Sequence, residues 1–392
     1  MNSVLVRYHE VALKKGNRRY FVELLKKNLL SSVADLGPKE IHSLSARLLL
    51  RLGENTNREE IARRLAAVFG VANFSFVERA PADVEVLKSK ILGSIDGMRF
   101  DSFRIDTKRG DKNFPLTSPE INREVGAAVK QSTGSRVDLK NAELTIFIEI
   151  LSDAAFYGFG KIAGPGGLPV GASGRVVSLI SGGIDSPVAA YRMMQRGCRL
   201  IFVHFHSAPY LDKTSQEKVR ELVKLLTRHQ FSSRLYLIPF GEIQRQIVAA
   251  VLRPLRVVLY RRMMMRIGEA IARKERAGAL VTGESLAQVA SQTLENMAVI
   301  GKATALPILR PLVGMDKQEI IDQARKIGTF DTSVIPDQDC CQLFMPRHPA
   351  TKAKLADVEE AESKLDVAAL TQLGVEKAEL EQLRFPPASR GE

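Results

Sequence analysis

Residues 181–186, Ser-Gly-Gly-Ile-Asp-Ser, place hydroxyls, glycines and a carboxylate within one short turn. The apolar run 176–180 comes before the turn, and a helical pattern begins at Asp185. Glycine lets the backbone approach a ligand closely, and a helix N-terminus offers N–H groups and a positive dipole end. The turn therefore predicts a phosphate site, in which Ser181 and Ser186 add hydroxyl donors. A carboxylate such as Asp185 suits this place only near Mg²⁺ or a transferred proton.

The pattern also narrows the kind of phosphate site. Neither G-x-x-x-x-G-K-[ST] nor G-x-G-x-x-G occurs in the chain, which excludes the P-loop and the dinucleotide fingerprint. The short serine-glycine turn with Asp185 resembles the PP-loop of ATP pyrophosphatases instead. That resemblance implies that ATP is split into AMP and pyrophosphate while a carbonyl or amide oxygen is adenylated. A tight strand–helix turn without a ligand is the alternative.

A second group with chemical potential is the pair Cys340-Cys341, which stands between two prolines in an expected loop. Adjacent cysteines cannot both ligate a metal as a C-x-x-C pair does. Chemistry on an adenylated carbonyl needs a nucleophile, and cysteine is the natural one, so we expect a reactive thiol here. An inert role is one alternative, and a metal or cluster site that adds Cys198 and His348 is another. Cys198 itself, between a helix and a strand, is expected in the core.

A third group is basic. Arg104, Lys108, Arg109 and Lys112 follow one another closely on an expected strand and loop. Such side chains neutralise phosphates and give affinity rather than sequence reading. Residues 103–129 resemble the THUMP domain, an RNA-binding module, so we expect RNA binding here. Because acidic residues are interspersed, a solvated salt-bridged surface is the alternative. Residues 253–276 predict a helix that packs one face and shows basic residues on the other.

Composition sets the frame for these sites. The chain has 392 residues and a formal net charge of +13, which favours two or three domains and an anionic partner such as nucleic acid. It has no run of 18 apolar residues and no signal-peptide layout, so no membrane span is expected. Three cysteines do not form a disulfide framework, and we expect a reducing cytoplasm.

Two patterns of elements position these groups. After residue 175, apolar runs at 176–180, 200–205, 235–239 and 279–282 alternate with helical stretches, which predicts a doubly wound parallel sheet. Ligands bind beyond the carboxyl ends of such strands, where the turn 181–186 lies. The first half mixes strands (3–8, 44–52, 144–151) with helices (20–33, 58–69), which predicts an α+β fold. Another helix is expected to begin with Ser118 as its N-cap and Pro119 as its first residue. The glycine-rich stretch 158–174 predicts a linker.

The three groups together resemble the bacterial tRNA 4-thiouridine synthetase (tRNA sulfurtransferase) family, and residues 7–21 and 311–321 also match it. The resemblance implies an N-terminal ferredoxin-like domain (1–55), a THUMP domain (56–160), a linker (161–175) and a PP-loop ATP pyrophosphatase domain (176–392). No cysteine follows Cys341, so we expect the short form without a rhodanese domain. Sulfur would then come from a separate donor.

Site residues follow from the same resemblance. It implies an ATP site formed by Leu179, Ile180, Ser181, Gly182, Gly183, Asp185, Ser186, His204, Phe205, Arg261, Gly283 and Gln292. Asp185 and Lys317 would serve adenylation, and Cys340 would carry sulfur as a persulfide. The implied cofactors are ATP and Mg²⁺, without a resident metal site.

The implied reaction is thiolation of a tRNA uridine, at position 8, to 4-thiouridine. The partners would be tRNA and a cysteine desulfurase or another sulfur donor. Sulfur transfer to a carrier protein for the thiamine thiazole ring and a homodimer are further options. An RNA-binding protein that uses ATP as a switch, or another PP-loop enzyme, is the alternative; tRNA-dependent release of pyrophosphate separates an enzyme from a pure binder.

Overall fold

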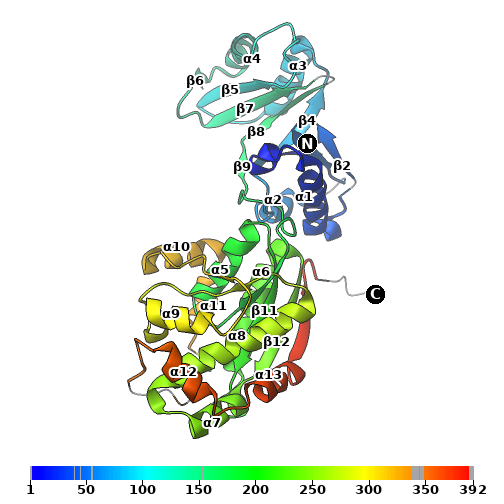
Figure 1. Cartoon of the computed structure of the whole chain (residues 1–392). Coiled ribbons are helices and arrows are strands. Elements are labelled where there is room, and N and C mark those ends of the chain that lie inside the picture. The colour runs from blue at the N-terminus through cyan, green and yellow to red at the C-terminus, as the bar shows by residue number, and fades with distance from the viewer. Residues whose placement is uncertain are drawn as a thin grey trace. The chain divides into compact units, whose positions relative to one another are not determined.

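The computed structural model describes residues 2–387 apart from 39, 45, 54–55, 152–153, 337–343 and 345–347. The chain divides into two compact units, Met1–Gly167 and Leu168–Glu392 (Figure 1). Within the described part, no helix is long and apolar enough to cross a membrane. The expected sequence of an α+β part followed by an α/β part is confirmed.

The first unit is built on one mixed sheet. Among its described residues the sheet has nine strands in the order β2-β3-β1-β4-β8-β7-β5-β6, and β9 pairs with β4. The strands are β1 (Ser3–Arg7), β2 (Glu40–Leu44), β3 (Arg47–Arg51), β4 (Asn73–Ala80), β5 (Ser102–Arg109), β6 (Arg136–Val137), β7 (Leu144–Ile150), β8 (Ala155–Phe159) and β9 (Ile162–Ala163). The helices are α1 (Arg18–Ser32), α2 (Arg58–Leu65), α3 (Val84–Ile95) and α4 (Ser118–Thr133). Strand β4 makes the sheet continuous, because its first five residues pair with β1 and its last three with β8.

Helix α4 begins at Ser118, one residue before the predicted first residue Pro119. The N-cap is Thr117, not Ser118, which is the first helical residue. The Thr117 hydroxyl accepts a hydrogen bond from the Glu120 N–H, and the Glu120 carboxylate accepts one from the Thr117 N–H. This reciprocal capping box satisfies two N–H donors at the start of the helix. With Ser118 as the N-cap, this pair of hydrogen bonds would not form.

Glycine also has a packing role in this unit. Gly158 lies inside β8 within the glycine-rich stretch, and a Cβ there would stand 2.2 Å from the Phe76 carbonyl oxygen and 2.9 Å from the Phe147 ring. Glycine at this position therefore permits close packing in a strand.

The second unit contains the expected parallel sheet. Among its described residues the strand order is β14-β13-β10-β11-β12-β15, with β15 antiparallel to β12 and the other neighbours parallel. The strands are β10 (Arg175–Leu179), β11 (Arg199–His206), β12 (Ser232–Pro239), β13 (Leu280–Val281), β14 (Ile308–Leu309) and β15 (Glu379–Arg384). The chain proceeds from β10 to β12 on one side and then crosses to β13 on the other. The sheet therefore has a topological switch point between β10 and β13, where ligands bind in such folds.

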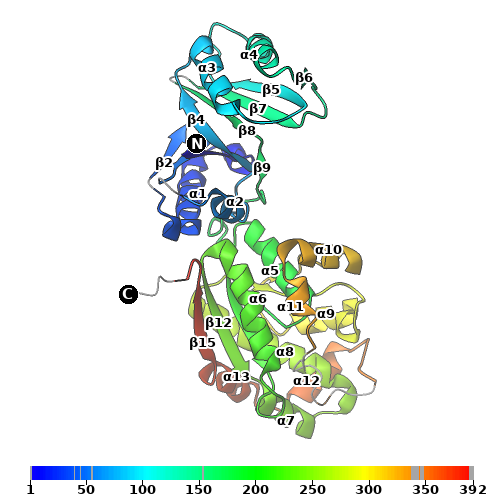
Figure 2. The same ribbon diagram turned by 180° about the vertical axis from the view of Figure 1, so that it is seen from behind.

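Helices cover both faces of this sheet. Helix α5 (Asp185–Gln195) and α6 (Thr214–Gln230) pack on one face, and α6 lies over the sheet in Figure 2. Helices α8 (Arg256–Glu275) and α13 (Val367–Glu376) pack on the other. The remaining helices are α7 (Gly241–Ala250), α9 (Leu294–Gly301), α10 (Lys317–Ile327), α11 (Phe330–Ser333) and α12 (Leu355–Glu362).

Helix α8 differs from the prediction of one apolar and one basic face. Arg262 is 2% exposed. Its guanidinium donates to both carboxylate oxygens of Glu362, at 3.1 and 2.7 Å. An arginine is buried here because α12 supplies its counter-charge, and the sequence of α8 alone does not contain that partner.

A candidate nucleotide site at the switch point

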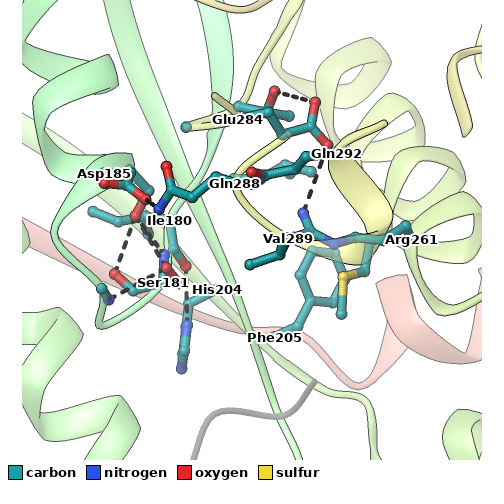
Figure 3. A pocket seen from close by; sticks show the side chains of 16 residues that line it. Ile180, Ser181, Asp185, His204, Phe205, Arg261, Glu284, Gln288, Val289 and Gln292 are labelled. Atoms are coloured by element: carbon teal, nitrogen blue, oxygen red, sulfur yellow. Dashed lines mark hydrogen bonds and ion pairs between the residues drawn. The ribbon is translucent and has the colours of Figure 1, made fainter. Parts of the chain in front are cut away.

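A pocket of about 220 Å³ opens at the carboxyl ends of β10 and β13 (Figure 3). The ends of three neighbouring strands, β10, β11 and β13, and the first turn of α5 contribute to its lining, together with α8 and the segment 282–292. The pocket therefore lies at the switch point of the sheet, where the strand order predicts a ligand.

The turn 181–186 is held by its own hydroxyls. The Ser186 hydroxyl accepts a hydrogen bond from the Ser181 N–H at 2.9 Å, and the Ser181 hydroxyl accepts one from the Gly183 N–H at 3.3 Å. The Ser333 hydroxyl donates to the Gly183 carbonyl at 3.4 Å. These bonds fix the turn against the start of α5 before any ligand arrives, which lowers the ordering cost of binding.

Asp185, the first residue of α5, has both carboxylate oxygens engaged. Lys317 Nζ lies 2.6 Å from Oδ1, and Gln288 Nε2 donates to Oδ2 at 2.9 Å. Lys317 reaches this place because it opens α10, whose N-cap Asp316 forms a capping box with Glu319. The structure thus joins two groups that are 132 residues apart in sequence into one ion pair at the pocket.

Gly283, two residues after β13, lies close to the backbone of the turn. A Cβ at this residue would stand 2.7 Å from both Cα and N of Ser186. Because those atoms are backbone, no side-chain movement could relieve the clash. Glycine is therefore required for the end of β13 to lie against the first turn of α5.

Strand β11 supplies a buried histidine and an aromatic ring. His204 is 2% exposed, and its Nδ1 lies 3.0 Å from the Ile180 carbonyl oxygen, which links the ends of β10 and β11. Phe205 also lines the pocket and is 5% exposed. Two residues further, burial lowers the pKa of His206 to about 4, so this imidazole is neutral at pH 7.

A buried carboxylate organises two arginines at the far wall. Glu284 has a side chain that is 2% exposed, accepts from Thr282 Oγ1 at 2.9 Å and from Arg310 Nε at 2.7 Å, and lies 3.8 Å from Arg261 Nη1. Figure 3 shows Arg261 and Glu284 facing one another across this wall. Glu284 therefore holds Arg261 in place and offsets part of its charge.

The predicted ATP residues gather at this pocket. Those that line it are Leu179, Ile180, Ser181, Gly183, Asp185, Ser186, His204, Phe205, Arg261, Gly283 and Gln292. Gly182 lies in the same turn but is not part of the lining, and Lys317 reaches the lining through Asp185. Cys340 and Cys341 lie outside the described residues. The binding roles of all these residues remain predictions.

Five further residues line the pocket, and sequence reasoning did not identify them: Met264, Thr282, Glu284, Gln288 and Val289. Two of them had a sequence signal, since Thr282 and Glu284 flank Gly283 at the end of a predicted strand. Gln288 and Val289 belong to an irregular segment without periodicity. Among the residues described, no group of three His, Cys, Asp or Glu side chains could hold a metal ion.

The four predicted RNA-binding residues fall into two classes. Arg104 donates to Thr145 Oγ1 at 3.0 Å and to the Leu139 carbonyl at 3.3 Å. Arg109 donates to the carbonyls of Phe114 and Leu116, both at 3.1 Å, and so braces the loop before α4. Lys108 and Lys112 are exposed. The two arginines therefore have structural bonds that the sequence did not indicate, and the two lysines are open to solvent.

The doubly wound sheet, the Ser-Gly-Gly turn and the switch-point pocket define a domain of the PP-loop ATP pyrophosphatase class. Family models match three parts of the chain. Residues 3–75 match the ThiI ferredoxin-like domain, residues 82–156 the THUMP domain, and residues 171–367 the model described as thiamine biosynthesis protein (ThiI).

Relatives extend the match to nearly the whole chain. A protein named Probable tRNA sulfurtransferase from Thermus thermophilus is 48% identical over 97% of this chain and 93% of its own length. One of the same name from Moorella thermoacetica is 46% identical over 96% and 97%. The solved structure of a 4-thiouridine synthetase–RNA complex with bound ATP superposes with a TM-score of 0.89 at 32% identity, covering 98% of this chain and all of the other. The chain belongs to the ThiI family of tRNA sulfurtransferases and is an enzyme of the tRNA uracil 4-sulfurtransferase type.

Proposed function

We propose that the switch-point pocket binds ATP and uses it to adenylate O4 of a tRNA uridine, at position 8, which is then thiolated to 4-thiouridine. The observation that carries this proposal is the convergence of the braced turn, the Asp185–Lys317 pair and Arg261 on one pocket. The printed title of the similar complex, which names both ATP and RNA, supports both ligands.

The lining suits the parts of ATP. The turn 181–186 and the start of α5 would receive the β- and γ-phosphates, since helix N-termini favour anions. Lys317 adds positive charge at that end through its contact with Asp185, and Arg261 adds positive charge at the far wall. Gln292 is 7% exposed and its amide oxygen has no hydrogen-bond partner among the described residues. A buried acceptor of this kind would suit the exocyclic amino group of adenine.

Mg²⁺ fits this donor set in the way that it usually binds beside phosphates, through one carboxylate and phosphate oxygens. Asp185 would hold it, because the other carboxylate in the lining, Glu284, is committed to Arg310 and Thr282. The ion would offset phosphate charge. Before then, Lys317 and Gln288 keep the Asp185 carboxylate ordered.

The reaction divides into two displacements. Uridine O4 forms a bond to the α-phosphorus of ATP as the bond to pyrophosphate breaks, and the N3 proton is lost. Sulfur then forms a bond to C4 while AMP departs with the original oxygen. With a persulfide on Cys340, the terminal sulfur attacks and a second thiol cleaves the S–S bond, which leaves a disulfide for an external thiol to reduce. If sulfide is first released from the persulfide, the second thiol again cleaves the S–S bond and the same disulfide forms. When free sulfide is supplied from solution, no persulfide is used and no disulfide forms.

Partners follow from this chemistry. The tRNA would contact the first unit, which contains the THUMP match. A cysteine desulfurase or another donor would supply sulfur. A sulfur carrier protein of thiamine synthesis and a homodimer are compatible with the family but have no support from particular residues here. A cytoplasmic enzyme is the expectation for such a substrate.

The test uses unmodified tRNA, ATP, Mg²⁺ and a cysteine desulfurase with cysteine. We expect tRNA-dependent release of pyrophosphate and a near-ultraviolet absorbance from thiouridine. A protein that uses ATP only as a switch would release no pyrophosphate. Absence of thiouridine, with the desulfurase or with added sulfide, would contradict the proposed function. A Cys340→Ser variant that keeps full persulfide-dependent activity would contradict the role given to that cysteine.

A further inference from the structure

One face of the sheet in the first unit carries a buried cluster of charged residues that the site above does not use. The alternate residues Phe103, Ile105, Ile146 and Ile148 of β5 and β7 belong to a core that includes residues of α3 and α4. Strand side chains alternate between faces, so Lys108 and Glu149 project from the opposite face. They are paired across β5 and β7 in the parallel register.

Glu149 lies at the centre of this cluster. Its side chain is 2% exposed, and each of its two oxygens receives one guanidinium, from Arg7 and from Arg47. The three residues come from β7, β1 and β3, and Arg7 and Arg47 are register partners. Two arginines against one carboxylate leave a net positive charge in a largely buried place, which favours an anion beside them.

One donor of Arg7 has no hydrogen-bond partner among the described residues. Its side chain is 6% exposed, and its Nη1 donates to Asn73 Oδ1 and Ser75 Oγ, both at 3.1 Å. Its Nη2 is buried and makes no hydrogen bond within the described residues. An unsatisfied buried donor costs about 1–3 kcal/mol, and more when the group is charged. A ligand atom that accepts from Nη2 would remove this cost.

Arg7 lines a cavity of about 170 Å³, within the first unit. The polar residues around it are Arg7, His9, Arg47, Asn73, Lys108 and Lys161. Lys161 is paired with Asp106, whereas Lys108 is exposed and has no ion pair in the described part of the chain. The cavity is thus lined by Arg7, whose Nη2 is a buried donor left without a partner in the described part of the chain, and by the exposed Lys108.

We propose that this cavity binds one phosphate group of the RNA strand, with Arg7 Nη2 donating to a phosphate oxygen and Lys108 supplying the second charge. The inference rests on the proposed function only in taking tRNA as the substrate. Arginine forks match the oxygen geometry of phosphate, and a phosphate contact at a rigid sheet fixes the register of an RNA without reading its sequence. The cluster Arg7–Glu149–Arg47 is then a preorganised anchor for the phosphate. Its Arg7 is the first residue of the segment 7–21 that resembles the family.

The experiment measures the affinity of the full-length protein for an unmodified tRNA transcript over a range of KCl concentrations. Three variants are compared. Lys108→Gln removes one charge at the cavity. Arg7→Lys keeps the charge beside Glu149 but removes the guanidinium fork. Lys130→Gln, an exposed residue of α4 on the other side of the sheet, is the charge-matched control.

Lys108→Gln should weaken binding about tenfold at moderate salt and reduce the slope of log K against log[KCl] by about 0.7–0.9, the value of one phosphate contact. Arg7→Lys should weaken binding several-fold with an unchanged slope, because its charge is kept. Lys130→Gln should change neither. Equal binding by all four proteins would overturn the proposal.

Inorganic phosphate separates the two sources of the anion. When potassium phosphate replaces KCl at equal ionic strength, tRNA binding by the unmodified protein should weaken further, and the Arg7→Lys variant should lose this extra effect. If phosphate raises the Tm through Arg7 while tRNA binding is the same in every variant, the cavity takes free phosphate and the RNA proposal is wrong. Thiouridine formation by the unmodified protein is measured in parallel, so that failure of the proposed function is seen separately.

Discussion

Glu284 gives the sharpest test of how the pocket is organised. The substitution Glu284→Gln keeps the size and shape of the side chain but removes its charge. It would leave Arg310, whose Nε lies 2.7 Å from Oε2, against a neutral amide oxygen, and would place the amide NH2 at the Oε1 position, which lies 3.8 Å from Arg261. The Thr282 hydroxyl donates to the same Oε2 and could still donate to the amide oxygen there.

The size of the effect follows from burial. Removing one partner of a buried ion pair costs about 3–5 kcal/mol in fully desolvated cases. Here the side chains of Arg310 and Arg261 are 19% and 24% exposed, so water recovers part of that cost. We expect a loss of about 2 kcal/mol in the free energy of unfolding, or a fall in Tm of about 4–8 °C for a unit of this size. Release of Arg261 should raise the KM for ATP about tenfold, which corresponds to about 1.4 kcal/mol.

Thermal unfolding and pyrophosphate release as a function of ATP concentration measure both effects. The matched control is Glu275→Gln. Glu275 is 4% exposed and accepts from Arg234 at 2.8 and 2.7 Å and from Tyr236, at a place that does not line the pocket. This variant should lower Tm without changing the KM for ATP. An unchanged KM in Glu284→Gln, or an equal rise in both variants, would refute the reasoning.

Three further predictions concern separate parts of the chain. Gly283→Ala should abolish ATP binding measured by calorimetry, because its Cβ would stand 2.7 Å from Ser186 backbone atoms, whereas Gly314→Ala, which has open space, should not. The pKa of His206 is lowered by burial to about 4, below the ordinary 6.5, so its contribution to stability is complete above pH 6.5 and is lost as the pH falls toward 4. Measured as unfolding free energy against pH, that loss should reach about 3 kcal/mol and be absent in His206→Gln; an identical pH profile would show that another group titrates. Arg109→Ala should loosen the loop before α4 and weaken tRNA binding without altering the salt slope, since its guanidinium is bonded to carbonyls rather than to phosphate; a reduced slope would instead identify Arg109 as a phosphate contact.

The position of the site could be predicted because it depends on local patterns. An apolar run that ends in Ser-Gly-Gly, followed by a helix, identifies a strand end at a helix N-terminus, and the structure has β10, the turn and α5 in that order. The alternation of strands and helices then predicts a parallel sheet with a switch point. Both inferences use residues that are close together in sequence.

The partners of the site could not be predicted in the same way. Glu284 and Arg310 are 26 residues apart, and Gln288 and Asp185 are 103 apart, so only the folded chain brings each pair together. The same is true of Arg7 and Glu149, which lie on strands 142 residues apart. The alternation of side chains predicts which face of its own strand each residue occupies. It does not show that Arg7 and Glu149 form an ion pair.

Two features that were missed in the sequence, the N-cap of α4 and strand β15, do have signals there. Thr117 and Glu120 have the spacing of a capping box, which favours Thr117 over Ser118 as the N-cap. Strand β15 was not expected, since its residues 379–384 are mostly charged or amide-bearing and only two are apolar. Such a composition is typical of an edge strand, and among the described strands β15 pairs with β12 alone.

The central claim is that ATP activates the uridine oxygen itself. A tRNA transcript carrying ¹⁸O at O4 of its uridines, incubated with the enzyme, ATP, Mg²⁺ and a sulfur donor, tests this directly by mass spectrometry of the nucleotide products. The account predicts one ¹⁸O atom in AMP for each 4-thiouridine formed, together with unlabelled pyrophosphate. Thiouridine formed alongside unlabelled AMP, or alongside ADP and phosphate, would contradict it.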